Sequence, residues 1–227
     1  MTESNPARLV VLISGTGRNL QALIDAQAMG QLGAQIVHVV SNRPKVPGLD
    51  RAAAAGIPTS VVDHQDYPSR EAFDTALAEV VEACHPDVIA LAGFMRILTP
   101  GFIRRFAGRL LNIHPSLLPK YRGLHTHRRA LEAGDREHGA SIHFVTEELD
   151  GGPVVLQGRI HIGSTDTPDT LARRVMEEIE LQIYPAAVRW MADGRLQLCD
   201  GRALMDGDPL DQPLSWPHDA LQEGLAP

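Results

Sequence analysis

Residues 9–20 read LVVLISGTGRNL, and this stretch decides the fold class. Its first five residues are an unbroken apolar run, residues 14–17 form a glycine-rich turn, and Leu20, Leu23 and Ile24 then recur at helical spacing. The pattern predicts a buried strand, a tight turn and a helix. A strand that is apolar along its whole length is typical of a sheet covered on both faces.

The same alternation continues along the chain. Further strands are predicted over residues 36–40, 58–62, 88–92 and 110–113, with helices over 49–55, 69–84 and 99–106 between them. We therefore expect an α/β protein with a mostly parallel, doubly wound, Rossmann-like sheet and helices on both faces. Ligands bind beyond the carboxyl ends of the strands in such sheets, so the residues that follow Ile13, Ala92 and Ile113 are the first candidates for a site.

Beyond Ile113 the rhythm changes. An irregular stretch over 114–126 precedes a predicted helix (127–133), two strands (141–145 and 154–162) and an amphipathic helix (168–183). We expect residues 1–200 to form one domain. Residues 201–227 are rich in Asp, Pro and Gly, which predicts a loosely structured C-terminal tail.

Composition excludes several classes of protein. The net charge of -7 comes without a basic stripe, which argues against nucleic-acid binding. No apolar run approaches the ~20 residues needed to cross a bilayer. Cys84 and Cys199 are isolated and the first seven residues are polar, so we expect a protein of the reducing cytoplasm.

The turn over residues 14–19 joins a strand to a helix N-terminus, where free N–H groups and the helix dipole favour an anion such as a phosphate. The alternative is a glycine turn needed only for chain reversal. A dinucleotide-binding fingerprint would need glycine at Leu20 and an acidic residue at Asn42, and both are absent, although Arg43 keeps a variant that binds a 2′-phosphate open.

The most unusual segment is NIHPSLLP, residues 112–119. Asn112 and His114 alternate with Ile113 at a strand end, so their side chains are expected to share one side while Ile113 packs into the core. Pro115 and Pro119 restrict the loop that follows and would hold the pair in place. A lone strand-end histidine is often a structural residue, but the neighbouring asparagine and the position favour a functional one here.

Three other features are ambiguous by themselves. Asp150-Gly151-Gly152 is either a plain turn or part of a site, and residues 93–98 are either a connecting loop or the lining of an apolar slot. Five histidines, His114, His125, His127, His138 and His143, raise a metal hypothesis that no His-Glu-x-x-His or cysteine pair supports. We therefore predict no metal.

Taken together, these segments resemble the glycinamide ribonucleotide formyltransferases, folate-dependent enzymes of purine biosynthesis. Residues 13–20 look like their phosphate loop, 91–98 their folate loop and 111–119 their catalytic strand, and 143–145 with 148–153 complete the pattern. The likeness runs from about Arg8 to Leu196. It implies a phosphate-binding half (about 8–107) and a folate-binding, catalytic half (about 108–200).

By this resemblance Asn112, His114 and Asp150 are the catalytic set. An amine that attacks a formyl carbon makes a tetrahedral oxyanion, towards which Asn112 would offer a neutral N–H and His114 a cationic one. Asp150 would accept, directly or through water, the proton that the amine loses. The resemblance implies no tightly bound cofactor, because 10-formyltetrahydrofolate is a cosubstrate.

The resemblance also implies the binding residues. The substrate, 5′-phosphoribosylglycinamide (GAR), would contact Gly17, Arg18, Asn19 and Glu180, and the folate would contact Arg70, Met95, Arg96, Ile97, Leu98, Asn112, Thr146, Glu147, Glu148, Leu149 and Asp150. The family usually has histidine after the glutamate, where this chain has Leu181, so the role of Glu180 rests on a weaker match. We expect a monomer or a homodimer.

Related formyl-folate enzymes share the HPSLLP segment. The methionyl-tRNA formyltransferases add a C-terminal domain and the formyltetrahydrofolate deformylases an N-terminal one, and 227 residues are expected to leave room for neither. A deformylase, in which water replaces the amine, remains the first alternative. A nucleotide-dependent oxidoreductase and a binding module without turnover are the others.

Overall fold

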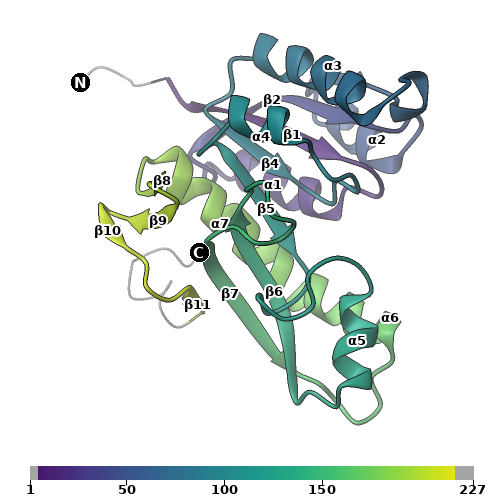
Figure 1. Cartoon of the computed structure of the whole chain (residues 1–227), viewed down its shortest axis with the longest axis vertical. Helices are drawn as coiled ribbons and strands as arrows, with labels where there is room; N and C mark the ends of the chain where they lie inside the picture. Colours follow the sequence, from purple (N-terminus) through teal and green to yellow (C-terminus); the bar gives the residue numbers. More distant parts are fainter. Residues whose placement is uncertain (1–4, 218–227) are drawn as a thin grey trace.

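The computed structural model describes residues 5–217 and is built on one eight-stranded sheet (Figure 1). The strand order is β11-β7-β6-β5-β4-β1-β2-β3. The strands are β1 (Ala7–Ile13), β2 (Ala34–Ser41), β3 (Thr59–Val61), β4 (Val88–Leu91), β5 (Leu110–His114), β6 (Glu137–Phe144), β7 (Val154–His161) and β11 (Leu214–Trp216). The five neighbouring strands β5, β4, β1, β2 and β3 pair in parallel, whereas β6 is antiparallel to both of its neighbours. The prediction of a mostly parallel α/β sheet is confirmed.

Helices cover the two faces of the sheet unequally. Side chains of α1 (Arg18–Ala28), α2 (Pro47–Ala54), α6 (Pro168–Val175) and α7 (Leu181–Ala192) pack on one face, together with the π-helical turn η2 (Met176–Glu180) that joins α6 to α7. On the other face, α3 (Arg70–Ala83) and α4 (Pro100–Arg105) cover the parallel strands. The short helix α5 (Thr126–Glu132) and the single turn η1 (His64–Asp66) lie in connections. None of the helices within residues 5–217 is long and apolar enough to cross a membrane.

Local signals set where these helices begin. The hydroxyl of Ser69 accepts a hydrogen bond from the backbone N–H of Ala72 at the start of α3. Thr167 and Thr170 bond reciprocally at the start of α6, and proline occupies the first helical position of both α4 and α6. The segment predicted as a helix over 168–183 therefore starts as expected, but it continues through η2 and past Pro185 to Ala192.

Alternate residues of β1 feed two separate cores. Leu9, Val11 and Ile13 pack with α1 and α7, and Val10 and Leu12 pack with α3 and α4. All five are fully buried. Each large apolar side chain removed from water in this way contributes roughly 1.5–3 kcal/mol, so the strand is stabilised from both sides.

The face of β5, β6 and β7 opposite α6 and α7 is polar. Asn112 pairs with His143 across β5 and β6, and Ser141 is the register partner of both His114 and Gln157. The intervening Ile113 and Ile142 face the apolar core, as the alternation predicts. Residues 115–125, which we call the covering loop, bond to this face: Ser141 Oγ donates to Ser116 O (2.6 Å), and Gln157 Nε2 donates to Leu118 O (2.8 Å).

The structure differs from the predicted loose tail over residues 202–216. Strands β8 (Leu196–Cys199), β9 (Arg202–Met205) and β10 (Asp208–Pro209) form a small antiparallel sheet, and β11 joins the main sheet. Asp200-Gly201 and Asp206-Gly207 have positive φ at both positions, the geometry of tight hairpin turns, so their acidic and glycine-rich composition marks turns here. Ala203 and Met205 are buried in the main core. Residues 218–227 of the predicted tail lie outside the described residues.

Candidate active site

The glycine-rich turn after β1 leads directly into the N-terminus of α1, and its backbone depends on glycine. Gly17 takes a left-handed conformation (φ 71°), and a Cβ there would lie 2.7 Å from the Cα of Gly48, so only glycine fits. By contrast, a Cβ at Gly15 would meet nothing within 4 Å, so the backbone there is open to a ligand. Arg18 begins α1, and its guanidinium forms an ion pair with Glu177 (3.0 Å) at the rim of the turn.

Behind the turn, Asn19 holds Glu180. Asn19 Nδ2 donates to Glu180 Oε2 over 2.7 Å, and both side chains are about 5% exposed. Burial raises the pKa of Glu180, while the Asn19 hydrogen bond and the charge of Arg18 act in the opposite direction. Asn19 Oδ1 is buried without a partner among the described atoms. The substrate-side residues that the resemblance implied therefore lie together, and a hydroxyl-bearing ligand could satisfy the free amide oxygen.

The implied catalytic residues also converge, from two distant parts of the chain. The imidazole Nδ1 of His114 lies 3.5 Å from Asp150 Oδ2, and both side chains are about nine-tenths buried. Asp150 Oδ1 lies 3.7 Å from His143 Nε2, and Asn112 Nδ2 lies 3.0 Å from the same nitrogen. The amide of Asn112, the imidazole of His143 and the carboxylate of Asp150 thus lie together at the end of β5, and the imidazole of His114 lies beside the same carboxylate.

Backbone carbonyl groups define which ring nitrogen of His143 and of His114 carries a hydrogen. His143 Nδ1–H donates to Phe144 O (2.8 Å), so in the neutral ring Nε2 is the acceptor, and burial lowers the pKa of His143. Asn112 therefore donates one of its two N–H groups to His143 and keeps the other. His114 Nε2–H donates to Tyr121 O (2.9 Å), which leaves Nδ1 facing Asp150.

A cavity of about 100 Å³ opens beside these side chains. It lies between the loop after β4 and the loop after β6. Nine of the residues implied for folate line it: Arg96, Ile97, Leu98, Asn112, Thr146, Glu147, Glu148, Leu149 and Asp150. Its mixture of apolar walls and a few polar groups suits a flat, partly polar ligand.

Two implied folate residues do not line this cavity. Arg70 is exposed at the first position of α3, and the side chain of Met95 is 58% exposed. The backbone of Met95 supports the loop after β4, since its N–H donates to Ser14 Oγ (2.7 Å). The same hydroxyl bonds Asn42 Oδ1, so Ser14 links the phosphate-type turn to the loop after β4.

Five residues that were not named individually as binding residues also line the cavity: Leu91, Phe94, Ile103, His143 and Val145. Four of them lie in the segments 91–98 and 143–145 that the resemblance marked, and Ile103 lies in neither. His143 was noticed only as part of the resemblance and as a metal candidate. Its strand alternation with Ser141, opposite a strand ending in Asn-Ile-His, is the signal that could have identified it.

The structure also bears on two other interpretations of the sequence. Within residues 5–217 no three His, Cys, Asp or Glu side chains are arranged to hold a metal ion. Asn42, where a dinucleotide-binding protein would carry an acid, is 1% exposed and bonded to Ser14 and His64. Its side chain supports the loops instead of facing a ribose.

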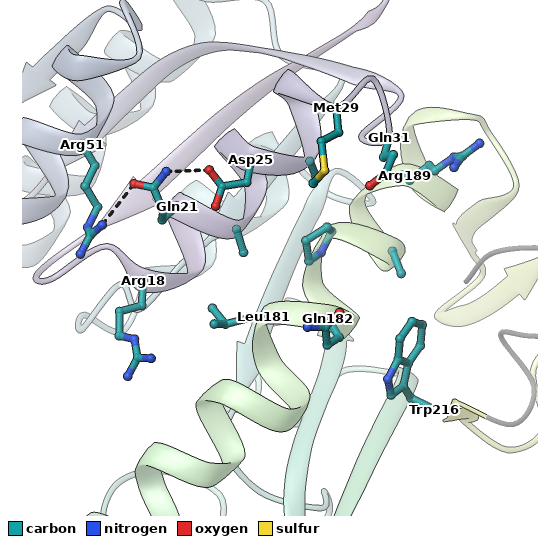
Figure 2. A pocket seen from close by; sticks show the side chains of 14 residues that line it. Arg18, Gln21, Asp25, Met29, Gln31, Arg51, Leu181, Gln182, Arg189 and Trp216 are labelled. Carbon is teal, nitrogen blue, oxygen red and sulfur yellow. Dashed lines mark hydrogen bonds between the residues drawn. The ribbon is translucent and has the colours of Figure 1, made fainter. Parts of the chain in front are cut away.

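A second, larger groove of about 700 Å³ lies between α1 and α7 (Figure 2). It is open, and Arg18 stands at one end of it, with Gln21 bonded to both Arg51 and Asp25 beside it. Trp216 from β11 closes the other end. Neither His114 nor Asp150 lines this groove, whereas Asn112, His143 and Asp150 line the smaller cavity and His114 lies beside Asp150.

Comparison with known proteins gives a consistent result. A family model described as "Formyl transferase" matches residues 7–188. The chain is 52% identical over 202 residues to the phosphoribosylglycinamide formyltransferase of Escherichia coli (strain K12), which covers 89% of this chain and 95% of that one. It is 47% identical over 196 residues to the trifunctional purine biosynthetic protein adenosine-3 of Homo sapiens, covering 86% of this chain and 19% of that protein. The solved phosphoribosylglycinamide formyltransferase of Coxiella burnetii matches with a TM-score of 0.89 and 47% identity, over 94% of this chain and 100% of that one.

Proposed function

The chain belongs to the formyl transferase family, and on that premise we propose that it transfers the formyl group of 10-formyltetrahydrofolate to the amine of GAR. The products are formyl-GAR and tetrahydrofolate, in purine biosynthesis. The formyl folate is a cosubstrate, and the reaction requires no tightly bound cofactor. The observation that carries the proposal is the convergence of His114, Asp150 and Asn112 beside the cavity, within a chain of this family.

In the proposed mechanism the amine nitrogen of GAR attacks the formyl carbon. A C–N bond forms, and the carbonyl electron pair moves to oxygen to give a tetrahedral oxyanion. The remaining N–H of Asn112 and the Nδ1–H of protonated His114 donate to that oxygen. Removing one such donor typically lowers the rate about 10²- to 10³-fold.

The tetrahedral intermediate then collapses. The bond between the carbon and N10 of the folate breaks, and N10 takes a proton. Asp150, directly or through water, accepts the proton that the attacking amine loses. Gly123 N–H donates to Asp150 Oδ2 (2.9 Å), which supports a carboxylate held ready as an acceptor.

The two substrates occupy different loops in this proposal. The phosphate of GAR binds at Gly17, Arg18 and Asn19, and Glu180 accepts from its ribose hydroxyls. The folate enters the small cavity through Arg96, Ile97, Leu98 and residues 146–150, and it reaches Met95 and Arg70 at the outside. This assigns phosphate binding to the half from about 8 to 107, with Glu180 the exception, and folate binding mainly to the half from about 108 to 200.

We also propose that the protein works in the cytoplasm as a monomer or homodimer. Isolated Cys84 and Cys199, both free thiols, support a reducing compartment. Sedimentation equilibrium at several protein concentrations will distinguish the two oligomeric states.

The direct test is to incubate the purified protein with GAR and 10-formyltetrahydrofolate. We expect tetrahydrofolate and formyl-GAR to appear in equal amounts, with no turnover when GAR is omitted. Release of formate in the absence of GAR would instead identify a deformylase. Absence of any folate-dependent product would contradict the proposal.

A further inference from the structure

Two of the three proposed catalytic groups, His114 and Asp150, are held by one short stretch of the covering loop. His114 Nε2 donates to the carbonyl oxygen of Tyr121, and the N–H of Gly123 donates to Asp150 Oδ2, each over 2.9 Å. Tyr121 and Gly123 are only two residues apart. The position of residues 121–123 therefore sets the position of the His114 imidazole relative to the Asp150 carboxylate.

The backbone of residues 121–123 has an unusual conformation. Tyr121 has φ 58° and Gly123 has φ 77°. A tyrosine in the left-handed region is held there by its surroundings, because the conformation is unfavourable for a side chain with a Cβ. Something outside the loop must therefore fix Tyr121.

Asp135 is placed to do so. It lies between α5 and β6, and its Oδ2 accepts from the Tyr121 hydroxyl over 2.7 Å. Its Oδ1 accepts from the ammonium of Lys120 over 2.9 Å, and these bonds lower the pKa of Asp135. Arg129 lies over the Tyr121 ring, 5.1 Å from its centre, and donates to Arg122 O. The side chain of Tyr121 is thus held by a hydrogen bond at its hydroxyl and by a cation–π contact on its ring.

We propose that Asp135 is a positioning residue for the reaction: through the Tyr121 hydroxyl it holds the Tyr121 carbonyl oxygen that orients the imidazole of His114. This rests on the proposed function. Asp135 lines neither the small cavity nor the groove between α1 and α7. Its bond keeps the Nε2–H of His114 directed at the carbonyl and keeps Nδ1 directed at the reacting centre, which preorganises the site.

The matched variants are Tyr121→Phe, Asp135→Ala and, as a control, Glu137→Ala. Tyr121→Phe keeps the ring and removes only the hydroxyl. Glu137 is an exposed carboxylate two residues from Asp135 that pairs with Arg159 (3.8 Å), so its loss removes a comparable surface charge away from the loop.

We expect Tyr121→Phe and Asp135→Ala each to lower kcat roughly 10- to 100-fold, with KM for both substrates within about twofold, because small misplacements of reacting groups act mainly on turnover. The double variant should lose no more than Asp135→Ala alone, since that variant already removes the hydrogen bond to the Tyr121 hydroxyl. Asp135→Asn should recover part of the activity, because the amide oxygen still accepts from the hydroxyl. Glu137→Ala should match the parent protein.

A second readout needs no activity. In protein labelled with ¹⁵N-histidine, the His114 signals are identified among the ten histidines by their loss in His114→Ala. The parent protein should give the pattern of an Nε2–H bonded to an acceptor, and Tyr121→Phe should lose it. Unchanged kcat together with an unchanged His114 spectrum in folded Tyr121→Phe and Asp135→Ala would overturn the proposal. An inactive parent protein with the expected spectral change would instead fault the proposed reaction alone.

Discussion

The five parallel strands β5, β4, β1, β2 and β3 and the antiparallel strands β6 and β7 offer ligands different surfaces. On the parallel side both faces are covered by helices, so polar groups reach a ligand only from loops at the carboxyl ends. On the antiparallel side one face carries Ser141, His143 and Gln157. The covering loop, and no helix within residues 5–217, bonds to this face through Ser141 and Gln157.

The two sides of the sheet differ in what they contribute to the proposed function. The turn after β1 belongs to the parallel side and leads into the N-terminus of α1, where we propose that the phosphate of GAR binds. Asn112 and His114 sit on β5, the last parallel strand, and meet Asp150 and His143 from the antiparallel side. Substitutions on the parallel side should therefore change substrate affinity. Substitutions at the junction of the two sides, where β5 pairs with β6, should change turnover.

The largest expected effect is at the junction. Asp150→Asn should lower kcat about 10²- to 10⁴-fold, as expected for loss of a general base, with little change in KM for either substrate. Asparagine tolerates the left-handed backbone of Asp150 (φ 47°), so the fold should persist. Steady-state kinetics against both substrates measure this, with exposed Asp211→Asn as the control. A rise in KM without loss of kcat would contradict the separation.

A smaller effect is expected on the parallel side. Arg18→Ala should raise KM for GAR about 10- to 100-fold while kcat and the folate KM stay nearly constant, because hydrogen bonds to charged groups contribute about 1.5–3 kcal/mol. Arg173→Ala is the matched control, since Arg173 pairs with the same Glu177 (3.6 Å) from α6. A fall in kcat for Arg18→Ala would mean that the turn also shapes the reacting centre.

The two sides should also differ in acid stability. Burial lowers the pKa of His138 on β6 to about 4, against 6.5 for a free histidine. Between these values the unfolded chain binds the proton and the folded chain does not, so the free energy of unfolding falls as the pH drops from 6.5 to about 4.

Urea titrations across that range should therefore show a shallower pH dependence for His138→Gln than for the parent protein. His38 on β2, whose pKa is also lowered by burial, provides the comparison on the parallel side, where we expect the smaller change. Equal slopes for His138→Gln and the parent protein would show that His138 is protonated equally in both states.

The smallest effect is expected far from the junction. Trp216→Ala should lower the free energy of unfolding by about 1 kcal/mol, because the side chain is only partly buried against the core, and should leave kcat unchanged. Chemical denaturation and steady-state kinetics measure both quantities. Loss of turnover in this variant would connect the groove between α1 and α7 with catalysis.

The parallel side was the more predictable one from sequence. Apolar strands, caps such as Ser69 and the position of Asn112 and His114 follow from local periodicity. The meeting of Asp150 with His114 does not, because it depends on an antiparallel pairing and a loop that no local pattern encodes. The contact between Tyr121 and His114 could not be predicted from the sequence for a further reason. It is made by a backbone carbonyl, which every residue has. The hairpins after Asp200 were misjudged because acidic turn residues resemble those of an unstructured tail.

One late strand has a consequence for the behaviour of the protein in solution. Without β11, the eight-residue β7 would form the margin of the sheet, with a row of amide and carbonyl groups free to pair with another chain. Leu214, Ser215 and Trp216 occupy that margin beside Leu156, Gln157 and Gly158. Pro217 follows at once and has no N–H to extend the ladder. The three residues of β11 thus shorten the stretch of β7 that is open to pairing with another chain, because they occupy its middle and leave only its two ends without a strand partner on that side.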